Sequence, residues 1–216
     1  MKRHALITFV SLILTSAAHA ASISYSDLIA LTTTNWSSSV TVPKFDPHIG
    51  ILTSIEFKLV GRVEGGMEFE SLDAAPATVT TSLTAEIKLM RPDLSLLLSV
   101  APAVNNVDNV TAFDGVIDFG GTSGRSYASL VASQMAAGTS PPPASDLALF
   151  TGAGSITLPV TATGLSSATG AGNLLVSFNT AAAAEVMVTY HYIPEPATLT
   201  ALASAGGWVV SRRRRR

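Results

Sequence analysis

The sequence contains no cysteine and little charge, with charged residues at 13% and aromatic residues at 6% of its 216 positions. The absence of cysteine excludes thiol catalysis, cysteine-ligated zinc and disulfide bonds. Histidine is also scarce, at positions 4, 19, 48 and 191. The sequence has no Gly-x-Ser-x-Gly, His-Glu-x-x-His or phosphate-binding glycine motif. Carboxylates are therefore the main groups left for general acid–base chemistry.

The N-terminus has the order of charges and apolar residues that is typical of a signal peptide. Lys2, Arg3 and His4 give a positive start, and the apolar run at 5–18 is too short to span a membrane comfortably. Ala18-His19-Ala20 then fits the small-x-small rule for signal cleavage. We expect cleavage after Ala20 and a mature chain that starts near Ala21. The alternative is a short buried helix at a domain edge.

Removal of this segment leaves an acidic chain. Between positions 21 and 193 there are six basic residues and fourteen acidic ones. This balance argues against a nucleic-acid partner, because affinity for nucleic acid depends on Lys and Arg neutralising phosphates. A stretch of this length can bury a hydrophobic core without disulfides, and it predicts a single domain.

The C-terminus has the features of a second membrane signal. The stretch 197–210 is apolar and would rise about 21 Å as a helix, short of the ~30 Å hydrocarbon core of a bilayer. By the positive-inside rule the terminal arginines should remain cytoplasmic, which leaves the domain outside. Pro194 and Pro196 bias Ile193 and Glu195 toward extended, non-helical geometry. The arginines are Arg212, Arg213, Arg214, Arg215 and Arg216.

This tail resembles the PEP-CTERM sorting signal of Gram-negative bacteria. The three-part match consists of Pro194-Glu195-Pro196, an apolar segment with Gly206, Gly207 and Trp208, and the arginine cluster. The resemblance implies that an exosortase, an integral-membrane cysteine protease, recognises Pro194, Glu195 and Pro196 and removes the helix. The alternative for the tail is a plain single-pass anchor with a stop-transfer cluster.

The region between the two signals predicts β-strands. Alternating apolar and polar residues dominate, and Val79, Thr81, Leu83, Ala85, Ile87 and Leu89 share one predicted strand face. We expect an all-β fold, a β-sandwich of roughly 7–10 antiparallel strands, flanked by a signal helix and a short C-terminal transmembrane helix. One helix is expected at 126–137, and a polyproline loop at 139–145. The predicted strands are 51–60, 67–72, 78–90, 94–101, 110–119, 155–161, 173–178 and 185–193.

The middle of the chain carries a series of short landmarks: Phe45-Asp46-Pro47, Gly50-Ile51-Leu52-Thr53, Asp118 to Gly124, Asp146-Leu147 and Phe150-Thr151-Gly152. In these landmarks the chain resembles choice-of-anchor E domains, which are exported bacterial domains. The resemblance spans about residues 23 to 192 and implies a surface protein of unassigned activity.

A few polar groups are candidate sites. Glu68 and Glu70 share a predicted strand face and could resemble the carboxylate pair of a hydrolase, although alternating solvent-facing glutamates explain them more simply. We expect His48 in a loop and His191 at an edge or on the surface. Asn105 to Asn109 and Asp114 to Asp118 could supply oxygen ligands for structural calcium, or could mark turns.

The sequence thus predicts three segments: a signal peptide at 1–20, an exported domain at 21–192 and a sorting signal at 193–216. The resemblance to PEP-CTERM proteins implies a surface or extracellular-matrix protein, exported across the inner membrane and transiently anchored in it, and we expect neither enzymatic activity nor a cofactor. The expected partners are the Sec machinery and the membrane and, as the resemblance implies, an exosortase and an exopolysaccharide in a biofilm. The alternative function is a carbohydrate-binding module or divergent carbohydrate-active enzyme held by a plain anchor.

Overall fold

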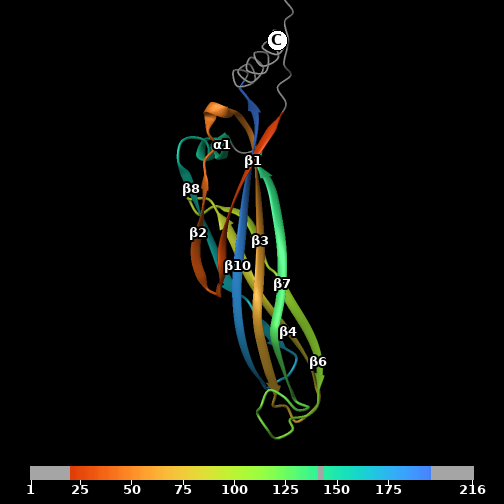
Figure 1. Cartoon of the computed structure of the whole chain (residues 1–216). Coiled ribbons are helices and arrows are strands. Elements are labelled where there is room, and N and C mark those ends of the chain that lie inside the picture. Colours follow the sequence, from red (N-terminus) through yellow and green to blue (C-terminus); the bar gives the residue numbers. More distant parts are fainter. Residues whose placement is uncertain (1–19, 141–143, 196–216) are drawn as a thin grey trace, which may run out of the picture.

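The chain folds into two antiparallel β-sheets that pack face to face (Figure 1). The structure is a computed structural model that describes residues 20–140 and 144–195. The first sheet has the order β1-β10-β3-β7 and the second the order β2-β8-β4-β5, with β6 and β9 also paired to β4. The strands are β1 (Ala21–Thr33), β2 (Trp36–Pro43), β3 (Gly50–Ser71), β4 (Ala77–Met90), β5 (Leu96–Val100), β6 (Ala103–Val110), β7 (Gly124–Ser140), β8 (Ser155–Gly164), β9 (Ser167–Thr169) and β10 (Leu174–Pro194). The described helices are the 3-10 helix η1 (Pro47–Ile49) and α1 (Ala144–Phe150).

The predicted all-β class is confirmed, and the number of strands lies within the predicted range. The expected signal helix and C-terminal helix lie outside the described residues. Within those residues, no helix combines the length and the apolar composition needed to cross a membrane.

The core lies between the two sheets, and strand alternation decides which residues enter it. Every second residue of β4 from Val79 onward is buried, and these are the six that the sequence placed on one face. Facing them from the first sheet are buried residues of β3 and β10 such as Leu59 and Val186. A separate, smaller cluster of Phe69, Val79 and Val110 lies at the end of the domain where β3 ends and β10 begins.

Two pairs of predicted strands are each one long strand in the structure. Strands predicted at 51–60 and 67–72 join as β3, and those at 173–178 and 185–193 join as β10. The glycines of this stretch predict a break in the strand, but β3 continues without interruption through all three, Gly61, Gly65 and Gly66. A Cβ at Gly61 would lie 2.5 Å from Val100 Cγ2, so this glycine marks a close approach of the second sheet.

The helix predicted at 126–137 is wrong, because this segment forms strand β7. The error has a physical cause. The register of β3 and β7 shifts between Gly65 and Met67, where Ser129 of β7 has a positive φ of 59°. The bulge places the half-buried Tyr127 and Leu130 three residues apart, a spacing that mimics a helix face.

Other boundaries also differ from the prediction. The strand predicted at 110–119 is a loop after Val110, whereas β6 occupies the asparagine-rich stretch just before it. Strands β1 and β2 and helix α1 were not predicted. β2 is rich in Ser and Thr, so its alternation carries little hydrophobic contrast, whereas β1 does alternate apolar and polar residues at Ile23-Ser24-Tyr25-Ser26.

The first and last strands of the domain meet at one end of the molecule. Ala21 of β1 pairs with Tyr192 of β10, and Pro194 pairs with Gly50 of β3. We call this the proximal end; it also carries α1, and the opposite, distal end carries the loop at 111–123 (Figure 1). The 22 residues of β3 would span about 70 Å at strand spacing, so the domain is elongated.

Candidate functional site

The described part of the predicted sorting motif consists of Pro194, the last residue of strand β10, and Glu195 directly after it. We call Ile193, Pro194 and Glu195 the strap. Ile193 pairs with Ile51 and Pro194 with Gly50, and the Glu195 amide donates to the carbonyl oxygen of Ile49 at 3.3 Å. The strap therefore continues the domain's own sheet, and the expected boundary between residues 192 and 193 falls inside a strand.

Gly50 makes room for the strap. A Cβ at this position would lie 2.2 Å from the carbonyl oxygen of Ile193 and 2.8 Å from Cδ2 of Tyr192. Real Cβ atoms do not approach backbone so closely, so any larger residue would push the strap away from β3. A register shift between His191 and Tyr192 precedes this contact, and the Thr53 hydroxyl donates to the His191 carbonyl there at 2.8 Å.

Aromatic rings hold the strand that leads into the strap. Tyr190 is fully buried, and its ring centroid lies 5.9 Å from that of Phe45 and 6.5 Å from that of Phe150. The Tyr190 hydroxyl donates to the Pro43 carbonyl at 2.8 Å. The rings of Tyr192 and Phe45 pack with their centroids 5.2 Å apart. Packed aromatic rings thus hold the last part of β10 against the proximal end of the domain.

Burial of Tyr190 predicts a loss of stability at alkaline pH. Burial raises the pKa of Tyr190 above its ordinary value of 10.0, and nearby Tyr25 adds to the rise. The unfolded chain releases this proton above about pH 10 while the folded chain keeps it, so the stabilisation is complete below that pH and is lost above it. We expect the free energy of unfolding to fall by about 1 kcal/mol per pH unit above pH 10 through this residue.

Urea unfolding of the wild type and Tyr190→Phe between about pH 8 and pH 11.5 measures this effect. The variant should be less stable at about pH 8 by roughly 1 kcal/mol, because it lacks the bond to Pro43, and the difference should vanish near about pH 11 and reverse above it. Parallel pH profiles for the two proteins would contradict the expectation.

The other residues of the two predicted signals lie partly outside the described residues. Ala20 is described and exposed, and Ala21 is the first residue of β1. Ala18, Pro196 and the arginines at 212–216 lie outside the described residues. The predicted signal cleavage position therefore directly precedes the first strand of the domain.

Glu68 and Glu70 share a strand face but do not form an open pair. Glu68 is half-buried in a hollow of about 230 Å³ that Ser126, Ser177 and Asn179 also line. Glu70 is fully buried, and its Oε1 accepts a hydrogen bond from the Ser123 hydroxyl at 2.5 Å. The interpretation of both as solvent-facing glutamates is therefore wrong for Glu70, which the loop before β7 covers.

The groups named as possible calcium ligands have other roles in the structure. Asn105 to Asn109 lie in β6 rather than in a loop. Asp114 accepts hydrogen bonds from the amides of Val116 and Thr122, and these bonds lower its pKa. Asp118 accepts one from the Gly120 amide at 2.8 Å. Both aspartates thus stabilise turns, and no cluster of three potential metal ligands occurs in 20–140 or 144–195.

Both histidines of the described residues lie on the surface. His48 is in η1, and its ring Nδ1 lies 2.7 Å from Asp46 Oδ1. His191 is half-exposed, with Nε2 3.6 Å from Oε2 of Glu56, on the central strand β10 rather than at an edge.

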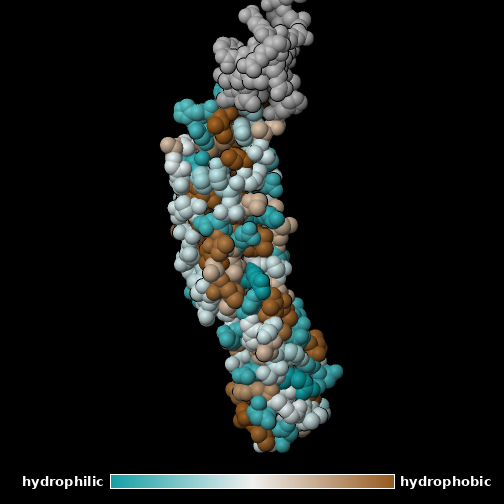
Figure 2. Space-filling model, viewed as in Figure 1, coloured by the Kyte–Doolittle hydropathy of each residue, from teal (hydrophilic) through white to brown (hydrophobic). Residues whose placement is uncertain are grey.

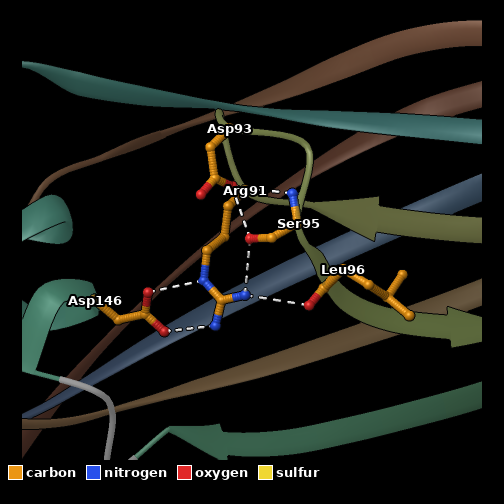
Figure 3. A network of polar contacts seen from close by, with 5 residues as sticks. All are labelled: Arg91, Asp93, Ser95, Leu96 and Asp146. Carbon is orange, nitrogen blue, oxygen red and sulfur yellow. Dashed lines mark hydrogen bonds and ion pairs between the residues drawn. The ribbon is translucent and has the colours of Figure 1, made fainter.

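Sequence reasoning missed the main polar network of the domain. Arg91, directly after β4, donates from Nε and Nη2 to the two carboxylate oxygens of Asp146 at 2.8 and 2.7 Å (Figure 3). Its Nη1 donates to the Ser95 hydroxyl and the Leu96 carbonyl, while Asp93 accepts from Ser95. The network fastens the β4–β5 turn to α1. In the sequence, the signal that could have indicated this network is Asp146, an acidic residue in the first turn of a helix.

The outer face of the first sheet has a mixed character. A shallow groove of about 500 Å³ crosses it, and its lining includes Leu28, Val60, Arg62, Val131 and Glu185. Figure 2 shows apolar and polar side chains interspersed over the viewed face. This mixture is typical of a solvated sheet face.

Comparisons with known proteins identify no family. No family model matches the chain, and no curated protein matches it. Among solved structures, it matches a chain of infectious bursal disease virus, Gx strain, at 16% identity and a TM-score of 0.19, covering 97% of this chain and 55% of that one. A second match, to the T13 particle of that virus, has 14% identity and a TM-score of 0.19, covering 89% and 45%. The chain spans about half the length of these proteins. TM-scores this low do not show a shared fold.

Proposed function

We propose that this chain is an exported surface or extracellular-matrix protein with a β-sandwich domain, sorted and cleaved by an exosortase at Pro194-Glu195-Pro196. The proposal depends on the tail and N-terminal patterns of the sequence. The proposed domain is flanked by a cleaved signal helix and by a short membrane helix with a cytoplasmic arginine cluster. Its role is structural or adhesive, in a biofilm or exopolysaccharide context.

One observation supports this proposal most strongly. Ala21, where the mature chain is expected to start, pairs with Tyr192, two residues before the motif. Both proposed membrane segments therefore leave the domain from the same end. This arrangement would let both segments reach one membrane while the whole length of the domain projects away from the bilayer.

Intact-mass analysis of the protein from its native host tests the proposal. The comparison variant replaces Pro194, Glu195 and Pro196 with alanines. We expect the wild type to lack both the signal peptide and the arginine cluster, and the variant to lack only the signal peptide. A mature wild type that still ends in Arg216 would show that the tail is a plain membrane anchor.

A further inference from the structure

Strand β7 is an edge strand with one unpaired side. It lies along one side of the first sheet, next to β3 (Figure 1). Among the described residues, no strand pairs with its other side. The second sheet contacts β7 through side chains: the Ala101 amide donates to Gln134 Oε1 at 2.7 Å. Ser133, Gln134 and Met135 are exposed in succession, so the edge is open to solvent as well as the outer face.

β7 lacks the features that usually keep an edge strand from pairing with another molecule. Such strands are commonly protected by charged residues, by proline or by short length. β1 contains Asp27, β2 contains Pro43 and β6 contains Asp108, while β5 and β9 have only five and three residues. β7 has 17 residues, with neither a charged residue nor a proline between Ser126 and Ser140.

A bulge limits the straight part of this edge. Ser129 has a positive φ of 59°, beside the shift in register between β3 and β7. Because a bulge bends a strand and interrupts its ladder, an added strand fits along the residues that follow Ser129. Val131 and Met135 lie on the outer face of this stretch and are 50% and 58% exposed, with Ser133 between them. The accessible edge therefore carries two apolar side chains on either side of a serine.

This stretch is complementary to itself. When two copies of β7 pair antiparallel with Ser133 opposite Ser133, Val131 of each copy lies opposite Met135 of the other. Each exposed apolar side chain is then covered by one from the second copy. The chain between 21 and 193 has an excess of acidic residues, but this stretch has no charge, so a second copy meets no like charge along the ladder.

We propose that the domain self-associates by strand addition: two copies pair antiparallel through β7 about a twofold axis at Ser133. The first sheets of the two copies then form one continuous sheet. The same surface is used by both copies, so the assembly closes as a dimer. This inference goes beyond the proposed function, because pairing through β7 depends neither on the tail nor on where the chain is sorted.

Antiparallel pairing places the proximal ends of the two domains at opposite ends of the dimer. One consequence rests on the proposed function, in which the proximal end faces the membrane. Copies anchored side by side in one membrane cannot pair in this way, whereas released copies and copies on facing surfaces can. The proposed adhesive role would then have a second copy of this chain as its partner.

A single cysteine at the twofold position tests the register. The chain has no cysteine, so one introduced thiol can form a disulfide only with another molecule. Directly opposite residues of an antiparallel pair have Cα atoms about 4.5–5.5 Å apart, a distance that a disulfide can bridge. Ser133→Cys, purified from the native host as the host processes it and oxidised with diamide, should form a disulfide-linked dimer. Its yield should exceed that of Val131→Cys by about tenfold or more.

Val131→Cys and Met135→Cys are the matched controls, because both lie on the same exposed face of β7. In the proposed dimer, each of these positions is displaced from its own copy by four residues, or about 14 Å, too far for a disulfide. Neither variant alone should give a dimer, but their mixture should. Equal yields from the three single variants would overturn the pairing, as would no dimer from Ser133→Cys or a disulfide adduct with a different protein.

A charge at the twofold position tests the association without a covalent bond. Ser133→Lys places two lysines directly opposite each other, whereas Thr139→Lys places its charge on the same face but outside the symmetric ladder. Sedimentation velocity should show a dimer for the wild type. The dissociation constant should rise by about tenfold or more in Ser133→Lys and by less than about threefold in Thr139→Lys. A wild type that stays monomeric would overturn the inference.

The two proposals fail in different ways. A wild-type chain that keeps Arg216 overturns the proposed function, and the disulfide at Ser133→Cys is still expected. A wild type that loses its tail, together with a Ser133→Cys variant that gives no dimer, overturns the inference alone.

Discussion

Replacing Gly65 with alanine should lower the free energy of unfolding by about 4 kcal/mol or more, a large part of the roughly 5–15 kcal/mol by which a typical domain is stable. Gly65 lies in β3, at the register shift opposite β7. A Cβ there would lie 1.8 Å from the carbonyl oxygen of Asn179 and 3.2 Å from Cα of Thr180. Both atoms belong to the backbone of β10, so no side chain can rotate away to relieve the overlap.

Gly138→Ala is the matched control for this prediction. Gly138 lies on β7 of the same sheet, and its Cβ would meet only Cδ2 of Leu98, at 3.2 Å. A flexible leucine can move by a few tenths of an ångström, so the control should change stability by less than about 1 kcal/mol. Guanidinium unfolding of both variants measures the difference. Equal stabilities would show that β3 and β10 can separate at the bulge without cost.

Breaking the contact between Arg91 and Asp146 should have the next largest effect. Asp146→Ala leaves the Arg91 guanidinium, whose side chain is only 22% exposed, without its bidentate partner. The hydrogen bonds to Asp146 raise the pKa of Arg91, so the arginine stays charged at every pH at which the domain folds. A largely buried charge that loses its partner costs about 3 kcal/mol or more of stability.

The double variant Arg91→Met with Asp146→Leu should recover most of this loss. Two apolar side chains need no hydrogen bonds, and replacing a buried ion pair by packed apolar residues is often neutral. A double-mutant cycle read by urea unfolding gives the coupling energy of the pair. Additive effects of the two single changes would contradict a specific interaction and would show that the turn and α1 are held by other contacts.

Several landmarks of the resemblance to choice-of-anchor E domains lie at the proximal end. They illustrate how much of the structure of this end the sequence could indicate. Phe45 and Phe150 are both buried, and the Phe45 amide donates to the Phe150 carbonyl at 2.8 Å. Gly50 receives the strap, and Asp146 binds Arg91. The sequence marked these positions without indicating that they contact one another, because their partners lie far away along the chain.

By itself, the sequence determined the all-β class, the inner face of β4 and the extended geometry of Ile193. Each follows from local rules: period-two alternation for the strands, and the restriction that proline places on the residue before it. The burial of alternate residues along β4 agrees with that pattern at all six positions.

Only the tertiary structure decided that 126–137 is a strand and that Glu70 is buried. It also placed Ala21 beside Tyr192. A bulge changes the spacing of inward side chains, a covering loop reverses the exposure of a carboxylate, and pairing between the first and last strands of the domain leaves no local trace. These features arise from contacts between distant segments, which hydrophobic periodicity does not encode.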